Sequence, residues 1–354
     1  MGDAATPESV TTMEYDDNGN LISVTDPEGN KTTYTYNVMG QVLTKTDHRG
    51  KVWTYNYDDI GNLKSVTDPL NNVTRYEYNK VGNKIKDTDP SGKVTQYEYD
   101  YNRNLKKITD AYGNITQFVY TDGKPTKRID PEGKELKQEY DNDGNLWKTI
   151  DGNGNTITYE YQNTPGTSCQ TCSGGAGSDA PTRMIYPTNF AKEIQYDKRG
   201  RKEIEKDISG TDQYLTKFGY DFSGNLILQT DKENHTTKYD YDELGRKIRV
   251  TDAINGVTEY TYDDRNNLIA LKDTNGNLTH FEYDRNNRLK KEIRPMGQAT
   301  AYDYDSAGSL IRKTDAKAQK TEYDYNDAGR ITGIRYYGAS DNAPQKTVNF
   351  RLLS

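Results

Sequence analysis

The chain has 354 residues, of which 32% are hydrophobic and 29% are charged, and it contains 30 tyrosines and 30 glycines. Its net charge of −7 argues against a sequence-independent nucleic-acid binder, because such binding depends on clustered lysines and arginines. No stretch of about eighteen apolar residues is present, and residues 1–5 lack the charged and then apolar layout of a secretory signal. The sequence therefore predicts no membrane span and no signal peptide in this chain.

A repeat of 21 residues organises the chain, and its marker in most copies is a tyrosine followed by Asp or Asn, with Gly or Asn three residues further on. These tyrosines are Tyr15, Tyr36, Tyr57, Tyr78, Tyr99, Tyr120, Tyr140, Tyr161, Tyr196, Tyr220, Tyr241, Tyr262, Tyr283, Tyr304 and Tyr325. The period predicts an N-terminal tail or incomplete first repeat at residues 1–12, a first block of repeats at 13–163, an insertion at 164–190, a second block at 191–335 and a truncated last repeat at 336–354.

Each repeat has the pattern of a β-hairpin. The segment Thr32–Tyr36 alternates sheet-favouring and polar residues at period two, which predicts a strand. The segment Asp16–Gly19 suits a tight turn, because an Asp side chain caps its own backbone two residues on and Gly accepts a positive φ. Residues Leu21–Thr25 are the predicted return strand, and the second turn, Asp26–Gly29, leads into the next hairpin.

Some thirty such strands, at about 4.8 Å each, predict a ribbon about 140 Å long. Open twisted sheets rarely exceed about ten strands without curling, so the predicted fold is all-β, with tandem hairpins in one coiled antiparallel sheet around a hollow space. Stacking of corresponding rings in neighbouring hairpins is expected to replace an aliphatic core. This predicted tyrosine ladder comprises Tyr36, Tyr57, Tyr78, Tyr99, Tyr241, Tyr262, Tyr283, Tyr304 and Tyr325.

Cys169 and Cys172 lie in the Gly/Ser-rich insertion. Two cysteines cannot form a four-cysteine zinc site, and a thioredoxin-like role needs a βαβ context that the repeat lacks. A local disulfide that closes the loop is one interpretation, and a pair of free thiols is the other. The spacing of His48, His235 and His280 gives no support for completing a zinc site, so we expect no metal.

The carboxylates of the chain do not indicate an active site. Asp26, Asp47 and Asp68 recur with the repeat, as a turn-forming role predicts, whereas catalysis needs one asymmetric constellation. No nucleophile elbow, zincin motif or phosphate-binding loop is present, so we expect no enzyme and no cofactor. The segments Asp141–Asn145 and Asp151–Asn155 look like pieces of calcium loops, but turn chemistry accounts for both of them.

The registered copies, seen in Tyr97–Asp100, Tyr239–Arg246 and Tyr323–Arg330, resemble the YD-repeat, or Rhs-repeat, family over about residues 13–335. The resemblance implies a large β-shell like those of bacterial Rhs toxins, insecticidal toxin complexes and teneurins. In the bacterial members the shell encloses a C-terminal toxic domain, which a self-cleaving segment releases. This chain carries neither segment, and its last copy, from Thr347, ends before the expected Tyr-Asp. We therefore expect a segment of a larger shell protein.

The resulting functional expectation is a non-enzymatic wall that, in a secreted or cell-surface parent protein, encapsulates a toxin or another polypeptide. Its expected partners are the remainder of the parent shell and the cargo, with no nucleic acid and no membrane. The alternative is an extracellular recognition or adhesion module that binds glycans or partner proteins, because tyrosines suit stacking on sugar rings. The two end strands of an excised sheet also favour self-association through their edges.

Overall fold

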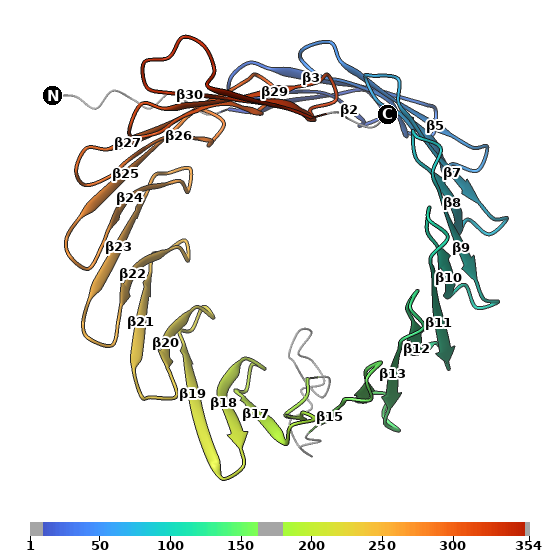
Figure 1. Ribbon diagram of the computed structural model, residues 1–354, viewed down its shortest axis with the longest axis vertical. Helices are drawn as coiled ribbons and strands as arrows, with labels where there is room; N and C mark the ends of the chain where they lie inside the picture. Colours follow the sequence, from blue (N-terminus) through green and yellow to red (C-terminus); the bar gives the residue numbers. More distant parts are fainter. Residues whose placement is uncertain (1–9, 162–179, 351–354) are drawn as a thin grey trace. The chain divides into compact units, whose positions relative to one another are not determined.

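The computed structural model describes residues 10–161 and 180–350. Over these residues the protein is all-β, without helices, and its 31 strands belong to one antiparallel sheet, which confirms the predicted fold class (Figure 1). Within the described ranges no helix has the length and apolar character needed to cross a membrane.

The strands are β1 (Thr12–Tyr15), β2 (Leu21–Thr25), β3 (Lys31–Tyr36), β4 (Val42–Thr46), β5 (Val52–Tyr57), β6 (Leu63–Thr67), β7 (Val73–Tyr78), β8 (Lys84–Thr88), β9 (Val94–Tyr99), β10 (Leu105–Thr109), β11 (Ile115–Thr121), β12 (Lys124–Ile129), β13 (Glu135–Tyr140), β14 (Leu146–Ile150), β15 (Thr156–Glu160) and β16 (Arg183–Ile185). They continue with β17 (Phe190–Tyr196), β18 (Lys202–Ser209), β19 (Asp212–Tyr220), β20 (Leu226–Thr230), β21 (Thr236–Tyr241), β22 (Lys247–Thr251), β23 (Val257–Tyr262), β24 (Leu268–Lys272), β25 (Leu278–Tyr283), β26 (Leu289–Ile293), β27 (Ala299–Tyr304), β28 (Leu310–Thr314), β29 (Lys320–Tyr325), β30 (Ile331–Tyr337) and β31 (Lys346–Asn349).

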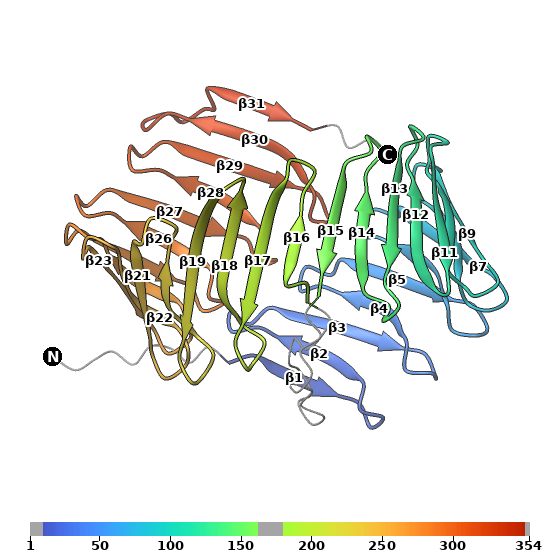
Figure 2. The same cartoon turned by 90° about the horizontal axis from the view of Figure 1, so that it is seen from below.

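The chain divides into two compact units. Unit 1 comprises residues 1–96 and 260–354, and unit 2 comprises residues 97–259. Unit 1 thus contains both the first strands of the chain, such as β1, β2 and β3, and the last ones, such as β29, β30 and β31, which are labelled in Figure 2.

Each repeat contributes two strands and two turns. In the hairpin of β3 and β4, Thr35 pairs with Thr44 but Tyr36 pairs with Val42, so the register shifts by one residue just before the turn. The same bulge occurs at the corresponding tyrosines of most of the other described hairpins, for example between Asp303 and Tyr304. A bulge at this position accommodates the five-residue connection and increases the twist of the ribbon.

The sheet has almost no packed core. Ala191 and Ile194 are the only hydrophobic side chains that the described residues bury, and no side chain is completely enclosed. The alternation of half-buried and exposed positions along strands such as β3 and β7 shows that both faces of the sheet meet solvent to some degree. The sheet is therefore a single layer whose stability depends on contacts between neighbouring strands and turns.

The period predicted a continuous insertion at residues 164–190, but β16 lies inside that range. Arg183–Ile185 pairs with β15 on one side and with β17 on the other. Its turn at Tyr186–Phe190 has Tyr186 and Asn189 (φ 58°) where many other repeats have Asp and Gly. The residues therefore do not match the repeat consensus, although the backbone hydrogen bonds of the turn are the same. The 180–190 part of the predicted insertion thus belongs to the sheet.

The two smaller irregularities of the period change the turns. The one-residue deletion before Tyr140 reduces the turn between β11 and β12 to Asp122 and Gly123, both with positive φ, as a tight hairpin turn requires. The three-residue insertion before Tyr220 lengthens β18 and β19, which are joined only by Gly210 and Thr211. Insertions and deletions are thus absorbed without breaking the order of the strands.

Candidate functional site

The aspartate that begins each turn is held by the turn itself. Asp16 Oδ1 accepts hydrogen bonds from the backbone N–H groups of Asn18 (3.0 Å) and Asn20 (2.8 Å), and Asp16 Oδ2 accepts one from the side-chain amide of Asn20 (2.9 Å). This hydrogen bond from the Asn20 side chain is the largest of the effects that lower the pKa of Asp16. The repeated aspartates therefore serve turn formation, as their periodic recurrence predicts.

The two segments that look like pieces of calcium loops have this same geometry. Asp141 Oδ1 accepts the backbone N–H of Asn145 at 2.8 Å, and Asp151 Oδ1 accepts the N–H groups of Asn153 and Asn155, both at 2.9 Å. Both segments are turns of the repeat.

The tyrosines at the ends of the strands connect one hairpin to the next. In at least ten copies of the described chain, the phenol Oη donates a hydrogen bond to the backbone carbonyl fifteen or, once, eighteen residues earlier, at or near the start of the preceding return strand. Among the predicted ladder residues these are Tyr36 to Leu21 (2.7 Å), Tyr57 to Val42 (3.0 Å), Tyr241 to Leu226 (2.9 Å), Tyr283 to Leu268 (3.0 Å), Tyr304 to Leu289 (3.0 Å) and Tyr325 to Leu310 (3.0 Å). The other four are Tyr140, Tyr161, Tyr196 and Tyr220.

Burial raises the pKa of several of these phenols, including those of Tyr36, Tyr241, Tyr283 and Tyr304. The hydroxyl-to-carbonyl bond was not anticipated from the repeat, which predicted ring stacking. Tyr78, Tyr99 and Tyr262 occupy the same strand-end position in β7, β9 and β23. Ring stacking along the whole ladder stays a prediction.

The residue five positions after the ladder tyrosine connects successive turns. Gln41 Nε2 donates to the carbonyl of Gly61 (2.8 Å), and Arg288 Nη1 donates to the carbonyl of Asp305 (3.2 Å). The Arg288 guanidinium also lies over the ring of Tyr304, 4.8 Å from its centroid. The repeat did not single out this position, because its residue type varies between copies.

Unit 1 contains a seam in which turns about 258 residues apart in the chain meet. The first turn of a repeat joins the two strands of its hairpin, and the second turn leads to the next hairpin. In the seam, three second turns face three first turns. The second turns are those between β2 and β3, β4 and β5, and β6 and β7, and the first turns are those between β25 and β26, β27 and β28, and β29 and β30. The contacts are Asn286 Nδ2 to Asp26 Oδ2 (2.9 Å), Arg285 N to Glu28 Oε1 (3.1 Å), His48 with Ser306, Lys51 Nζ to Asp327 Oδ2 (2.8 Å) and Arg330 Nη2 to Asp68 Oδ2 (3.6 Å).

Contacts across the seam help to lower the pKa values of the aspartates that take part in it. Burial alone would raise the pKa of Asp26, but hydrogen bonds from Asn30 and Asn286 outweigh it and hold the pKa below its usual range. The pKa of Asp68 is also lowered, because hydrogen bonds from its own turn and the charge of Arg330 outweigh burial. Both carboxylates are therefore ionised at neutral pH and accept contacts from the facing turns.

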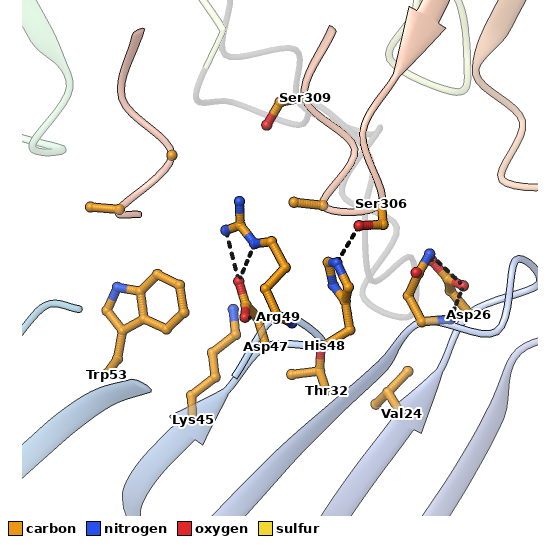
Figure 3. A pocket seen from close by; sticks show the side chains of 14 residues that line it. Val24, Asp26, Thr32, Lys45, Asp47, His48, Arg49, Trp53, Ser306 and Ser309 are labelled. Atoms are coloured by element: carbon orange, nitrogen blue, oxygen red, sulfur yellow. Dashed lines mark hydrogen bonds and ion pairs between the residues drawn. The ribbon is translucent and has the colours of Figure 1, made fainter. Parts of the chain in front are cut away.

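A pocket of about 310 Å³ lies along this seam (Figure 3). On one side, Arg49 is paired with Asp47 through two hydrogen bonds to Oδ2 (2.7 and 2.9 Å), and Lys45 Nζ lies 5.5 Å from the centre of the Trp53 ring. On the other side the small residues Ala307, Ala328 and Gly329 line the pocket and permit close approach of the turns. The pocket thus follows from turns that meet only at their tips.

The remaining residues singled out in the sequence are dispersed. Cys169 and Cys172 lie outside the described residues. His48 lies in the seam of unit 1, His280 lies on β25, and His235 ends the second turn between β20 and β21 in unit 2. The structure brings none of these three histidines together.

Comparisons with known proteins agree with this architecture. The family model described as Teneurin YD-shell matches residues 178–342, and the model described as RHS Repeat matches residues 15–52, 57–89 and 84–115. The comparison with curated proteins gives no match.

Two solved structures share the fold. The crystal structure of TcdB2-TccC3 is similar with a TM-score of 0.72 and 15% identity, over 97% of this chain and 21% of that chain. The crystal structure of TcdB2-TccC3-TEV is similar with a TM-score of 0.50 and 14% identity, over 96% of this chain and 22% of that chain. The chain thus spans about a fifth of the length of these relatives. The matches of these two family models confirm the predicted resemblance to the YD-repeat, or RHS-repeat, family, and the solved structures show that the chain shares the fold of the TcdB2-TccC3 shell.

Proposed function

We propose that this segment is part of the wall of a hollow shell that, in a larger parent protein, encapsulates a polypeptide. The parent shell and its cargo are the partners, and the parent is a secreted or cell-surface protein. The wall acts by excluding other macromolecules and performs no catalysis.

The single-layer character of the sheet carries this proposal. A packed domain needs a second layer to cover one face of its sheet, whereas here Ala191 and Ile194 are the only buried hydrophobic side chains of the described chain. A sheet that meets solvent on both sides suits a wall with an aqueous space behind it. Its strength comes from backbone pairing, tyrosine hydroxyls and turn-to-turn contacts.

The seam of unit 1 supports a wall rather than an isolated ribbon. It joins first turns to second turns at three successive positions, with one contact to Asp26, one to His48 and one to Asp68. Such repeated contacts join two rows of turns in this unit, as a barrier to macromolecules requires.

Encapsulation can be tested by fusing a disordered polypeptide of about 60 residues, with one protease site, after Ser354. Cleavage of this fused polypeptide by a folded protease is compared with cleavage of the same polypeptide added free to the unfused chain. We expect at least tenfold slower cleavage of the fused form. Equal rates, with the β-sheet circular dichroism spectrum preserved, would contradict encapsulation while leaving the shell fold intact.

A further inference from the structure

The second turn between β20 and β21 in unit 2 gathers three side chains with different metal-binding atoms. His235 Nδ1 lies 3.3 Å from Asp231 Oδ2 and 3.6 Å from Glu233 Oε2. The three ligand atoms all lie within 4.8 Å of one another. The other oxygen of Asp231, Oδ1, accepts the backbone N–H groups of Glu233 and His235, both at 2.9 Å. The backbone of the turn therefore fixes the direction of Oδ2.

The imidazole occupies a place that several repeats give to an asparagine amide. In the turns that end at Asn72 and Asn277, the asparagine Nδ2 donates to the second oxygen of the turn aspartate at 2.9 Å. His235 replaces that amide and brings a ring nitrogen to the same carboxylate oxygen. Among the second turns of the described chain, only residues 231–235 combine Asp, Glu and His.

Two other turns show that the acids alone do not make this arrangement. The turn 26–30 also has Asp followed by Glu two residues later, but it ends in Asn30, and its Glu28 accepts a hydrogen bond from Arg285 in the seam. The turn 130–134 has the same two acids and ends in Lys134. The nitrogen donor of His235 distinguishes the turn at 231–235 from both.

The three atoms converge on a position that a proton or a cation can occupy. The two carboxylate oxygens are acceptors, and Nδ1 of the imidazole is either a donor or an acceptor, depending on the tautomer. When Nδ1 carries no proton, all three atoms are acceptors and a cation can bind between them. The cation of the same turn does not fill this position, because Lys232 Nζ lies over the Tyr214 ring, 5.5 Å from its centroid. In a tetrahedral site with bonds of about 2.1 Å, ligand atoms lie about 3.4 Å apart, between the two distances that His235 makes.

We propose that Asp231, Glu233 and His235 bind one divalent first-row transition ion, for which Zn²⁺ is the probe. Imidazole nitrogen with carboxylate oxygen is a donor set that suits Zn²⁺, and Ca²⁺ prefers oxygen ligands alone. The three side chains are 45–65% exposed, so the remaining coordination position is open to water or to a donor from a partner.

The test is calorimetric titration of Zn²⁺ into the full chain. Cys169 and Cys172 are replaced by Ser in every variant, so that thiolates do not contribute. We expect one equivalent of Zn²⁺ to bind. His235→Asn, which installs the residue found in several equivalent turns, and Glu233→Gln should each weaken binding by at least about tenfold. His280→Asn, a histidine outside the cluster, is the matched control and should bind as the parent does.

A second measurement identifies the ligands. Co²⁺ bound at the site should give visible absorption bands of low coordination number, and these should disappear in His235→Asn, whose circular dichroism spectrum should match that of the parent. The proposal is overturned if no Zn²⁺ binds, or if His235→Asn binds Zn²⁺ as tightly as the parent does. It is also overturned if Ca²⁺ binds to the parent and to His235→Asn with equal affinity. Each result leaves only a hydrogen-bonded acidic turn.

Discussion

Replacing Tyr304 with Phe tests whether the tyrosine hydroxyls hold successive hairpins together. Tyr304 ends β27, and its hydroxyl donates to the carbonyl of Leu289, the first residue of β26, at 3.0 Å. Phe keeps the ring, and therefore keeps the contact with the Arg288 guanidinium at 4.8 Å. The substitution removes one hydrogen bond and leaves the packing of the ring nearly unchanged.

The expected loss is about 1 kcal/mol in the free energy of unfolding, because an intramolecular hydrogen bond contributes about 0.5–1.5 kcal/mol net. Water can reach the freed carbonyl in a single-layer sheet, so the larger penalty of a buried unsatisfied acceptor does not apply. In a repeat protein, contributions between neighbouring repeats add approximately. Replacing Tyr57, Tyr283, Tyr304 and Tyr325 together should therefore destabilise the protein by about 4 kcal/mol.

Urea unfolding followed by far-ultraviolet circular dichroism measures this loss. The matched control is Tyr302→Phe, on the same strand two residues earlier, where no hydroxyl hydrogen bond is formed with the described residues. That variant should stay within about 0.5 kcal/mol of the parent. If Tyr304→Phe is no more destabilising than Tyr302→Phe, the hydroxyls of the strand-end tyrosines do not stabilise the sheet and the inference is wrong.

Three further outcomes are expected. Gly308 has φ +88°, so Gly308→Ala should lower the free energy of unfolding by about 1 kcal/mol. Ala318 has φ 60°, which favours glycine, so Ala318→Gly should raise the free energy of unfolding by about 0.5–1 kcal/mol. Urea unfolding measures both changes. A double-mutant cycle on Lys51 and Asp327 should give a coupling of about 0.5 kcal/mol that falls in high salt, because both side chains are partly exposed. Several turn aspartates, among them Asp16, Asp58 and Asp273, have folded pKa values below normal, chiefly through hydrogen bonds from asparagine side chains. The stability they provide is present above the unfolded pKa of about 3.9 and is lost as pH falls through the lower folded values, so the urea midpoint should be level from pH 7 to about 5 and fall below about 4.

The strands and turns could be predicted because their signals are local. The strand signal is the alternation within Thr32–Tyr36, and the turn signal is the residue types of Asp26–Gly29. Each signal spans only a few positions, and the fifteen copies of the repeat reinforce it. β16 was missed for the same reason, since Tyr186 and Asn189 changed the local signal while the backbone kept its turn.

The contacts of the candidate site could not be predicted, because they depend on how hairpins pair and twist. The hydroxyl of Tyr304 reaches Leu289 only after β26 and β27 are aligned, and no pattern within one repeat contains that distance. The seam is further still from any local signal, since His48 and Ser306 are 258 residues apart in the chain and no pattern within a repeat pairs their turns. Side chains at these turn tips vary between copies, so the consensus carries no trace of their partners.

Departures from the repeat are therefore where specific function is to be sought. The conserved columns, such as the turn aspartates and the strand-end tyrosines, do the same structural work in every copy and cannot distinguish one part of the wall from another. The residues at the turn tips vary between copies and can distinguish them. Ala307 and Ala328 allow turns to meet in the seam, and His235 adds a third candidate metal ligand beside Asp231 and Glu233. A single-layer wall leaves both kinds of tip accessible, so a repeat protein of this type can change its contacts one turn at a time without altering its sheet.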